Sequence, residues 1–312
     1  RFPALLNAPP QSIHLRGADG RIRAPFIYAE AQALDADTFQ YVFTEDKTRV
    51  YPVRLFVRAE KYRFLGILRT DVHLFGTGDP TVPIFLFGSD TLGRDLFSRI
   101  VLGTRISLTI GLVGVLIGFV LGLLIGGVSG YFGGTVDAII QRCIDFLISM
   151  PQLPLWMALS AALPRNWPVV KTYFAITIVL SIIGWCGLAR VVRGKLLALR
   201  EEDFAMAARA GGASEWRIIT RHLLPSFFSY LVVNITLAIP GMIIGETSLS
   251  FLGLGMRPPA VSWGVLLQDA QNIIVVAQRP WQLIPCIFVI VTVLMFNFLG
   301  DGLRDAADPY AR

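Results

Sequence analysis

The 312-residue chain is 54% hydrophobic and 16% charged, whereas an average soluble domain is about 45–50% apolar and about 25% charged. Its net charge is +6, but the basic residues do not form a patch interleaved with aromatic residues, which argues against a nucleic-acid-binding protein. The cysteines Cys143, Cys186 and Cys286 have no CxxC or His-rich context, so we interpret them as apolar packing residues rather than metal ligands.

Residues 1–104 are polar and mixed in charge, and they contain short alternating runs typical of strands. One run contains Phe39, Tyr41 and Phe43, and the other spans residues 53–57, so that residues 44–48 are predicted to form a hairpin loop. We expect a small, partly β extracytoplasmic segment. Because the chain begins with Arg1 rather than Met, we also expect a further membrane span before it.

From residue 105 onward, five stretches lack Asp, Glu, Lys and Arg over roughly the 17–25 residues that a membrane helix needs. These stretches are residues 106–128, 146–163, 172–189, 226–245 and 280–300. Five of them favour an all-α polytopic membrane domain over residues 105–312 and argue against a soluble protein with buried core helices.

Topology follows from the basic residues in the short loops. Residues 190–221 carry seven Lys or Arg, whereas the loops near 164–171 and 249–279 carry two each. The positive-inside rule therefore places residues 190–221 and the C-terminus in the cytoplasm, and the segment 1–104 outside.

The first span contains a four-residue glycine repeat, formed by Gly114, Gly118, Gly122 and Gly126. This spacing predicts a helix face that another helix can approach closely, either within the chain or in a partner. Ordinary glycine enrichment in membrane helices is the alternative.

The cytoplasmic segment 201–221 is predicted to contain a short amphipathic helix. An alanine-rich stretch favours the helix, Gly211 and Gly212 should end it, and Pro225 should lie near the start of the next span. Here the sequence resembles the EAA motif of ABC importer permeases, which reads Glu-Ala-Ala, three residues, Gly, nine residues and Ile-x-Leu-Pro. Met206 stands at the Glu position of this motif and His222 at the Ile position.

The resemblance implies that this segment is the coupling helix that docks on an ATPase subunit. The coupling positions that it implies are Asp203, Met206, Ala207, Ala208, Gly212, Ala213, Ser214, Leu224 and Pro225.

Three further segments resemble the dipeptide and oligopeptide permeases of this class. Residues 87–108 are similar to FGTDxxGRDxxSR followed by GxRxSL, with Ser89 at the usual Thr position, residues 245–255 are similar to ESxLSFLGLG, and residues 302–309 are similar to the closing segment. The signature positions are Gly88, Asp90, Gly93, Arg94, Asp95, Arg99, Glu246, Gly253 and Gly255.

Several of these residues have alternative roles. The charged residues of 90–99 either pair locally and fix the loop before the first span, or contact substrate. Asp145 is expected to pair with Arg142, three residues earlier, and Glu246 to lie at an outer helix end. Candidate pore-lining residues are Asn234, Thr236, Trp185 and Gln152, each of which can instead serve helix packing.

The resemblance implies the second-type permease subunit of a peptide importer, with the helical bundle of type I importers, in a bacterial cytoplasmic membrane. Its expected partners are a homologous permease, two ATPase subunits that bind ATP and Mg, and an extracytoplasmic solute-binding protein. Nickel chelates, oligosaccharides and opine-like compounds are alternative cargoes.

Other function classes have less support in the sequence. The only Gly-Lys pair, Gly194-Lys195, is followed by Leu196, so the chain has no GxxxxGK[ST] loop and is expected to be a pore subunit rather than an enzyme. Gly127 to Gly130 is similar to a rhomboid protease motif, but all three histidines lie outside the spans. An ion-coupled transporter or a channel would need mid-membrane carboxylates or a filter-like loop.

Overall fold

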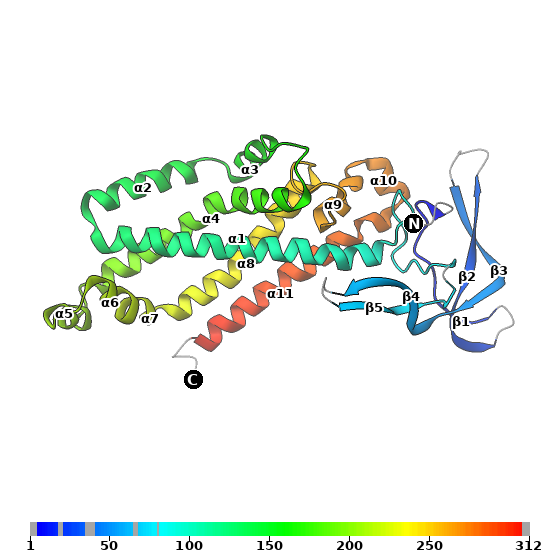
Figure 1. The fold of residues 1–312 in the computed structure, drawn as a ribbon, viewed down its shortest axis with the longest axis horizontal. Coiled ribbons are helices and arrows are strands. Elements are labelled where there is room, and N and C mark those ends of the chain that lie inside the picture. The colour runs from blue at the N-terminus through cyan, green and yellow to red at the C-terminus, as the bar shows by residue number, and fades with distance from the viewer. Residues whose placement is uncertain (1–4, 18–20, 35–40, 65–67, 80, 308–312) are drawn as a thin grey trace. The chain divides into compact units, whose positions relative to one another are not determined.

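The computed structural model describes residues 5–17, 21–34, 41–64, 68–79 and 81–307. The chain forms two compact units, one of residues 1–101 with 269–284 and one of residues 102–268 with 285–312. The helices and strands of both are labelled in Figure 1.

The first unit contains two small antiparallel sheets. One has the strand order β1-β2-β3 and the other pairs β4 with β5. The strands are β1 (His14–Arg16), β2 (Ile22–Leu34), β3 (Tyr41–Pro52), β4 (Arg54–Phe64) and β5 (Leu68–Gly76).

The predicted hairpin loop at residues 44–48 is wrong, because these residues lie within β3. The β2–β3 register moves from Tyr28 opposite Val50 to Ala29 opposite Asp46, so three residues bulge out between these two pairs. In this bulge the Asp46 carboxylate accepts the backbone N–H of Thr48 at 3.0 Å. The polar residues that suggested a loop therefore form a β-bulge, and Phe39 of the first run lies outside the described residues.

Residues 269–284 complete the first unit with short helices: most of η3 (Gln268–Gln271), α10 (Ile273–Gln278) and η4 (Pro280–Leu283). The last predicted span, 280–300, thus starts with a 3₁₀ turn, and the continuous helix α11 begins at Ile284.

The second unit is helical. Its elements are most of α1 (Leu96–Phe132), α2 (Gly134–Ser149), α3 (Gln152–Ala161), α4 (Val169–Leu199), α5 (Asp203–Ala210), α6 (Glu215–Ile218), the π-helix η2 (Ile219–Leu223), α7 (Leu224–Ser226), α8 (Phe228–Phe251), α9 (Trp263–Leu267) and α11 (Ile284–Ala307).

Four helices in the described part of the chain are long and apolar enough to cross a membrane, namely α1, α4, α8 and residues Pro280–Ala306. The predicted span 146–163 is not one continuous helix: it covers the end of α2 and all of α3, which meet at an angle of 84° and count as a fifth span if the bent pair is one broken span. Met150 is extended at this break and Pro151 follows it. Proline disfavours a helical conformation in the residue before it and removes a backbone donor, so the helix ends there.

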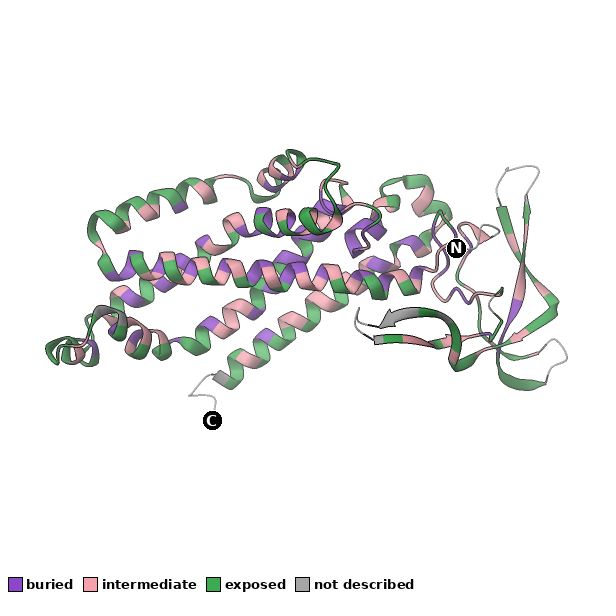
Figure 2. Cartoon of the chain, viewed as in Figure 1, coloured by how far each residue is buried: buried purple, intermediate pink, exposed green. Residues whose placement is uncertain are grey.

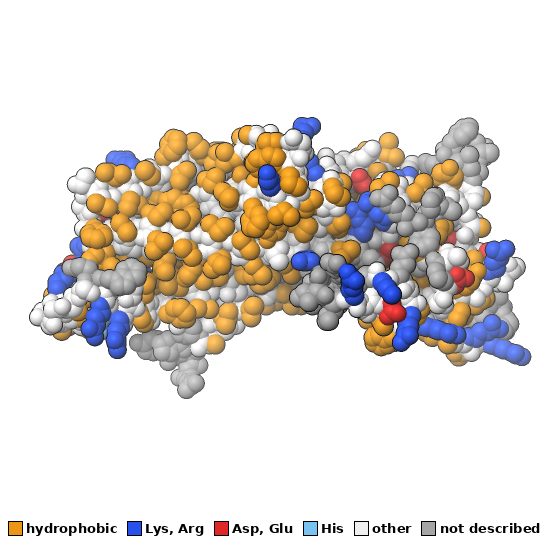
Figure 3. Space-filling model, in the orientation of Figure 1, with side chains coloured by type: hydrophobic (Ala, Val, Ile, Leu, Met, Phe, Trp, Pro, Cys, Tyr) orange, Lys and Arg blue, Asp and Glu red, His pale blue; other side chains and the backbone are white. Residues whose placement is uncertain are grey.

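The surface of the helical unit is largely apolar. On α11, Ile287, Ile290, Leu294 and Phe298 are 56%, 52%, 47% and 68% exposed. Figure 2 shows exposed residues along α2 and α11, and Figure 3 shows hydrophobic side chains over this face, with Lys and Arg gathered near α5 and α6. Apolar surface of this extent suits contact with lipid, and the chain is a multi-pass membrane protein.

The glycine face of α1 packs within the chain. A Cβ atom at Gly118 would lie 3.5 Å from the carbonyl carbon of Gly184, and one at Gly126 would lie 2.5 Å from the carbonyl oxygen of Ala189. A side chain at Gly126 would therefore push α4 away from α1.

Candidate functional site

The segment predicted to couple to a partner ends α5 with a glycine turn. The N–H of Ala213 donates to the carbonyl of Ala208 at 3.0 Å, and that of Gly212 to the carbonyl of Arg209 at 3.0 Å. Gly212 has φ of +77°, which is unfavourable for other residues. This pattern is a Schellman motif, which ends α5 sharply and turns the chain into α6.

One face of the segment is anchored in the bundle. Ala205 is 3% exposed and belongs to a buried cluster whose other members are Phe227, just before α8, and residues of α1, α4, α6, η2 and α8. They include Tyr131, Leu196, Ile218, Leu223 and Leu231, and Ala208, Ala213 and Leu224 pack against the cluster. Beside it, the Arg200 guanidinium donates to the carbonyl oxygen of Tyr131 at 3.2 Å.

Most of the remaining surface of α5 and the turn after it is exposed. Phe204 and Met206 are 43% and 48% exposed, and Asp203, Ala207, Ser214 and Pro225 are exposed as well. The position where the EAA motif has Glu thus presents an apolar side chain to the surroundings. Exposed aromatic and methionine side chains are enriched at protein interfaces.

Two ion pairs tie α2 to α4 near this segment. Asp137 accepts both Nε and Nη2 of Arg193 at 2.5 Å. The predicted Arg142–Asp145 pair is wrong, because Asp145 binds Arg190 of α4 instead. The helix face with Asp145 packs on α4, where Ile144 is buried against Cys186 and Ala189, so Arg190, next to Ala189, lies within reach.

The signature residues 88–99 form a compact, hydrogen-bonded loop and the start of α1 in the first unit. Ser89 is fully buried, and its hydroxyl donates to the carbonyl of Leu5 at 2.6 Å and accepts the N–H of Ala8 at 2.8 Å. A Cβ atom at Gly88, whose φ is +76°, would lie 2.7 Å from both the Ala8 carbonyl oxygen and the Trp281 ring. The signature residues therefore hold residues 5–8 and η4 against the loop before α1.

The charged side chains of this loop form ion pairs with one another. Asp90 is 4% exposed and binds the guanidinium groups of Arg94, at 2.7 Å, and Arg99. Burial alone would raise the pKa of Asp90, but the N–H groups of Arg94 and Leu92 and both guanidinium groups hold it below its usual value. These contacts support the loop-fixing role of Asp90, Arg94 and Arg99.

Asp95 has a different role. Its carboxylate accepts the N–H of Ser98 at 2.8 Å, which caps the first turn of α1. Burial raises the pKa of Asp95, and this carboxylate forms none of the ion pairs seen in the described residues. Gly93, with φ of +65°, closes the turn before it.

Glu246 is the centre of a buried polar cluster in the helical unit. It lies in the last two turns of α8 and is fully buried. The hydroxyls of Ser107 on α1 and Ser250 on α8 donate to its two oxygens at 3.0 and 2.7 Å. Both hydroxyls in turn accept backbone N–H groups, from Trp263 at 3.1 Å and Met256 at 2.9 Å. The carboxyl group therefore links α1, α8 and the segment that leads into α9.

The glycines after Glu246 allow this close packing. Gly253, with φ of +73°, ends α8 in the same Schellman pattern, with the N–H of Leu254 donating to the carbonyl of Leu249 at 2.9 Å. A Cβ atom at Gly255 would lie 2.6 Å from the backbone nitrogen of Ser250. The chain then turns back so that all five residues of α9 are buried.

The predicted pore-lining residues do not form one site. Asn234 lines a small cavity of about 30 Å³ with Gly118 and Gly184, Thr236 donates to the carbonyl of Val232 at 3.0 Å within α8, and Trp185 packs on the Ile144 cluster. Gln152 is exposed at the start of α3. Among the described residues no group of three or more His, Cys, Asp or Glu side chains could hold a metal ion.

Sequence reasoning missed several partners. Ser107 lies within the 103–108 signature match, so this match was the signal for its partnership with Glu246. No pattern marked Tyr131 or Arg190, because their roles depend on which helix packs beside them.

Comparisons with known proteins show the family of this chain. The family model described as "Binding-protein-dependent transport system inner membrane component" matches residues 118–312. The chain is 41% identical over 227 residues to the dipeptide transport system permease protein DppC of Bacillus subtilis, covering 72% of this chain and 69% of that protein. It is 39% identical over 244 residues to the oligopeptide transport system permease protein OppC of Haemophilus influenzae, covering 78% and 76%.

The fold also resembles solved transporters. An inward-facing structure of the MetNI methionine ABC transporter has a TM-score of 0.54 and 20% identity, and the match covers 68% of this chain and 98% of that one. A crystal structure of an amino acid ABC transporter with histidines has a TM-score of 0.51 and 16% identity, covering 67% and 94%. At these identities the likeness concerns the fold alone.

Proposed function

Because this chain belongs to the family of binding-protein-dependent transport system inner membrane components, we propose that it is a pore subunit of an ATP-driven peptide importer. The cargo assignment is supported by the relatives described above, which are named as dipeptide and oligopeptide permeases. The proposed location is a bacterial cytoplasmic membrane, with the C-terminus inside as the positive-inside rule predicts.

The proposed partners are a homologous permease, two ATPase subunits that bind ATP and Mg, and an extracytoplasmic solute-binding protein. The observation that carries the proposal is the construction of the α5–α7 segment. It is anchored in the bundle through Ala205 and exposes Phe204 and Met206, which flank Ala205 on two sides of the helix. Exposed apolar side chains on a capped helix next to a membrane bundle suit a partner that docks there.

This construction can transmit a displacement. Ala205 shares its buried cluster with Leu196 of α4 and Leu231 of α8. Close-packed interiors move as bodies rather than deform, so a displacement of α5 by a moving ATPase subunit would carry the ends of both spans with it. Alternating access of the pore to the two membrane faces is the mechanism that this motion would serve.

The test is to purify the chain with its co-expressed partner subunits and measure ATPase activity in nanodiscs. Phe204→Asp combined with Met206→Asp places two carboxylates on the exposed face, and we expect loss of the copurifying ATPase or of stimulation by the binding protein. Thr135→Asp is the control: Thr135 is exposed in the first turn of α2, where an added carboxylate is tolerated.

If the double variant retains ATPase and stimulation at the wild-type level, the docking face is assigned wrongly. If no ATPase copurifies with the wild-type chain, the importer assignment itself fails and an ion-coupled transporter becomes the reading to test. The cargo is tested separately. Peptide-loaded binding protein should stimulate ATPase activity more than the same protein loaded with oligosaccharide or a nickel chelate.

A further inference from the structure

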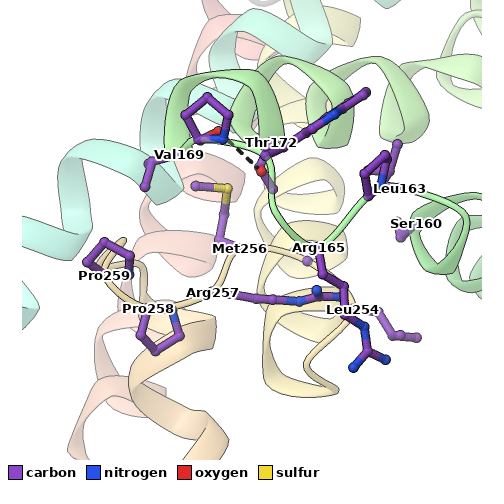
Figure 4. A pocket seen from close by; sticks show the side chains of 14 residues that line it. Ser160, Leu163, Arg165, Val169, Thr172, Leu254, Met256, Arg257, Pro258 and Pro259 are labelled. Carbon is purple, nitrogen blue, oxygen red and sulfur yellow. Dashed lines mark hydrogen bonds between the residues drawn. The ribbon is translucent and has the colours of Figure 1, made fainter.

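A pocket of about 350 Å³ lies in the helical unit between two loops. One loop joins α3 to α4 and contributes Arg165 and Trp167, and the other follows α8 and contributes Arg257 and Pro258 (Figure 4). The volume lies in the range of small-molecule sites, about 300–1,000 Å³. None of the roles assigned above uses these residues.

The pocket lies at a membrane boundary. It adjoins the first turn of α4 and the residues that follow the last turn of α8. Since α4 and α8 each cross the membrane once, these two helix ends share one face, opposite the face with α5 to α7. Trp167, which is 38% exposed, is of the residue type enriched at the bilayer–water interface.

The wall of the pocket continues into lipid-facing surface. Val169 and Thr172 of α4 line the pocket, while Val170 and Phe174, on the same first turns, are 65% and 55% exposed. A molecule in the pocket can therefore extend directly along an apolar helix surface.

Two guanidinium groups line the pocket, those of Arg165 and Arg257. The side chains of Arg165 and Arg257 extend toward the same place, beside Leu254 (Figure 4). Among the described residues neither forms an ion pair with a carboxylate. The Nε of Arg257 donates to the carbonyl of Gly253 at 3.1 Å, which uses one of its five N–H donors. Two positive charges that line one pocket favour an anion as its ligand.

A buried hydroxyl also lines the pocket. Ser160 at the end of α3 is fully buried, and its hydroxyl has no hydrogen-bond partner in the structure. Leaving such a group unpaired costs about 1–3 kcal/mol, so a polar ligand that reaches Ser160 would gain a hydrogen bond there.

We propose that this pocket binds the headgroup of an anionic phospholipid of the outer leaflet. Its phosphate lies between Arg165 and Arg257, its glycerol hydroxyl or ester oxygens reach Ser160, and its acyl chains lie along Val170 and Phe174. Arginine pairs bind phosphate by charge-assisted hydrogen bonds. The adjoining apolar surface favours a lipid over a soluble anion or an acidic protein surface.

The test is native mass spectrometry of the full chain purified with its partner subunits, delipidated and then titrated with phosphatidylglycerol or with phosphatidylcholine of the same acyl chains. We expect selective retention of phosphatidylglycerol. Arg165→Gln combined with Arg257→Gln should lower that retention about tenfold or more, to the phosphatidylcholine level, because two charge-assisted contacts are lost. Ser160→Ala should lower it less.

Arg105→Gln is the matched control. Arg105 is exposed in the N-terminal part of α1 and does not line the pocket. The lysine variants Arg165→Lys and Arg257→Lys keep the charge and should retain part of the selectivity, which separates the loss of charge from misfolding.

Unchanged phosphatidylglycerol retention in the double glutamine variant would overturn the proposal. Displacement of phosphatidylglycerol by inorganic phosphate would also overturn it, in favour of a free anion. A double variant that keeps the lipid but loses stimulation by the binding protein would assign the arginines to an acidic protein surface instead. The lipid measurement needs no ATP hydrolysis, so its outcome is independent of the proposed coupling function.

Discussion

The ends of α5 and α8 share one backbone motif but differ in what surrounds it. Both helices end in a Schellman turn with a glycine at positive φ, Gly212 at +77° and Gly253 at +73°. A Cβ atom at Gly212 would meet nothing within 4 Å, whereas one at Gly253 would lie 2.8 Å from the side-chain nitrogen of Gln268.

The two turns therefore have different roles. The turn after α5 leaves an apolar face exposed, which is available to another protein. The turn after α8 returns the chain onto the bundle, where Glu246 binds hydroxyls from α1 and α8. Equal glycine chemistry therefore serves a docking surface in one region and a sealed internal cluster in the other.

The largest effect is expected from Gly255→Val at the sealed end. Even a Cβ atom there would lie 2.5 Å from the Ser250 hydroxyl and 2.6 Å from its backbone nitrogen, so the chain after α8 cannot keep its path. Overpacking of this kind costs about 1–3 kcal/mol or more, and we expect loss of the assembled complex on size-exclusion chromatography. The control is Gly241→Val, since a Cβ atom at Gly241 would meet nothing within 4 Å. Similar losses in both variants would contradict the steric explanation.

Replacement of Glu246 should be about as severe. In Glu246→Leu the hydroxyls of Ser107 and Ser250 lose their acceptor, at a cost of about 1–3 kcal/mol for each group left unpaired. Glu246→Gln keeps an acceptor oxygen and should retain most of the thermal stability. The check is the melting temperature of the complex in detergent, and equal melting temperatures for the two variants would contradict the linking role of the carboxyl group.

A second carboxyl group, that of Glu30, has fewer hydrogen-bond donors than Glu246. Glu30 on β2 is paired across the strands with Glu45, and one of its oxygens has no partner. Burial chiefly raises its pKa from 4.5 to about 7, with a smaller contribution from Glu45. The folded state therefore keeps a proton that the unfolded state has lost. The contribution of this carboxyl group to folding stability therefore decreases as the pH rises from about 4.5 to 7. The decrease is on the order of 2–3 kcal/mol once the shift is discounted for solvent screening of this partly exposed group.

Hydrogen exchange of the β2 and β3 amides, corrected for intrinsic rates, measures this effect. Protection should fall between pH 5 and pH 8 in the wild type. In Glu30→Gln the part of the decrease that is due to this carboxyl should disappear, because the amide does not titrate. An identical decrease in the variant would show that Glu30 is solvated rather than buried.

The smallest effect is expected from Gly212→Ala at the exposed end. No atom would contact the new methyl group, so the cost is that of positive φ alone, roughly 1 kcal/mol. We expect nearly normal assembly and a modest increase in exchange of the α5 amides. A loss of assembly as large as that of Gly255→Val would show that the two turns are not different in kind.

The positions of most long helices in the helical unit could be predicted from the length of the segments that lack charged residues. The windows 106–128, 172–189 and 226–245 fall on α1, α4 and α8, because in a bilayer every backbone group of a spanning segment must be satisfied within a helix. The window 146–163 falls on the bent pair α2 and α3, and hydropathy alone does not show the break at Pro151. The strand pairing of residues 41–64 failed because period-two alternation identifies strands without naming their partners.

The candidate sites divide in the same way. The motif matches identified Gly88, Asp90, Gly212, Glu246 and Gly253, but not what each contacts. Asp90 and Arg94 lie four residues apart, so their ion pair follows from local spacing. The contacts of Glu246 with Ser107, of Asp145 with Arg190 and of Ser89 with Leu5 join residues far apart in the chain, and no local pattern specifies them.

By itself, the sequence determined the membrane character, the positions of most spans, the predicted orientation and the resemblance to importer permeases. These depend on composition and short-range spacing, which are local properties of a chain. The tertiary structure was needed to show that the signature at 88–99 holds residues 5–8 and η4 in place and that Glu246 is the centre of a buried cluster. It was also needed to show that Asp145 pairs with α4 and that Arg165 and Arg257 share a pocket. Helix packing brings these residues together across long sequence separations, and the identity of the facing residue is set by the neighbouring helix rather than by the residue itself.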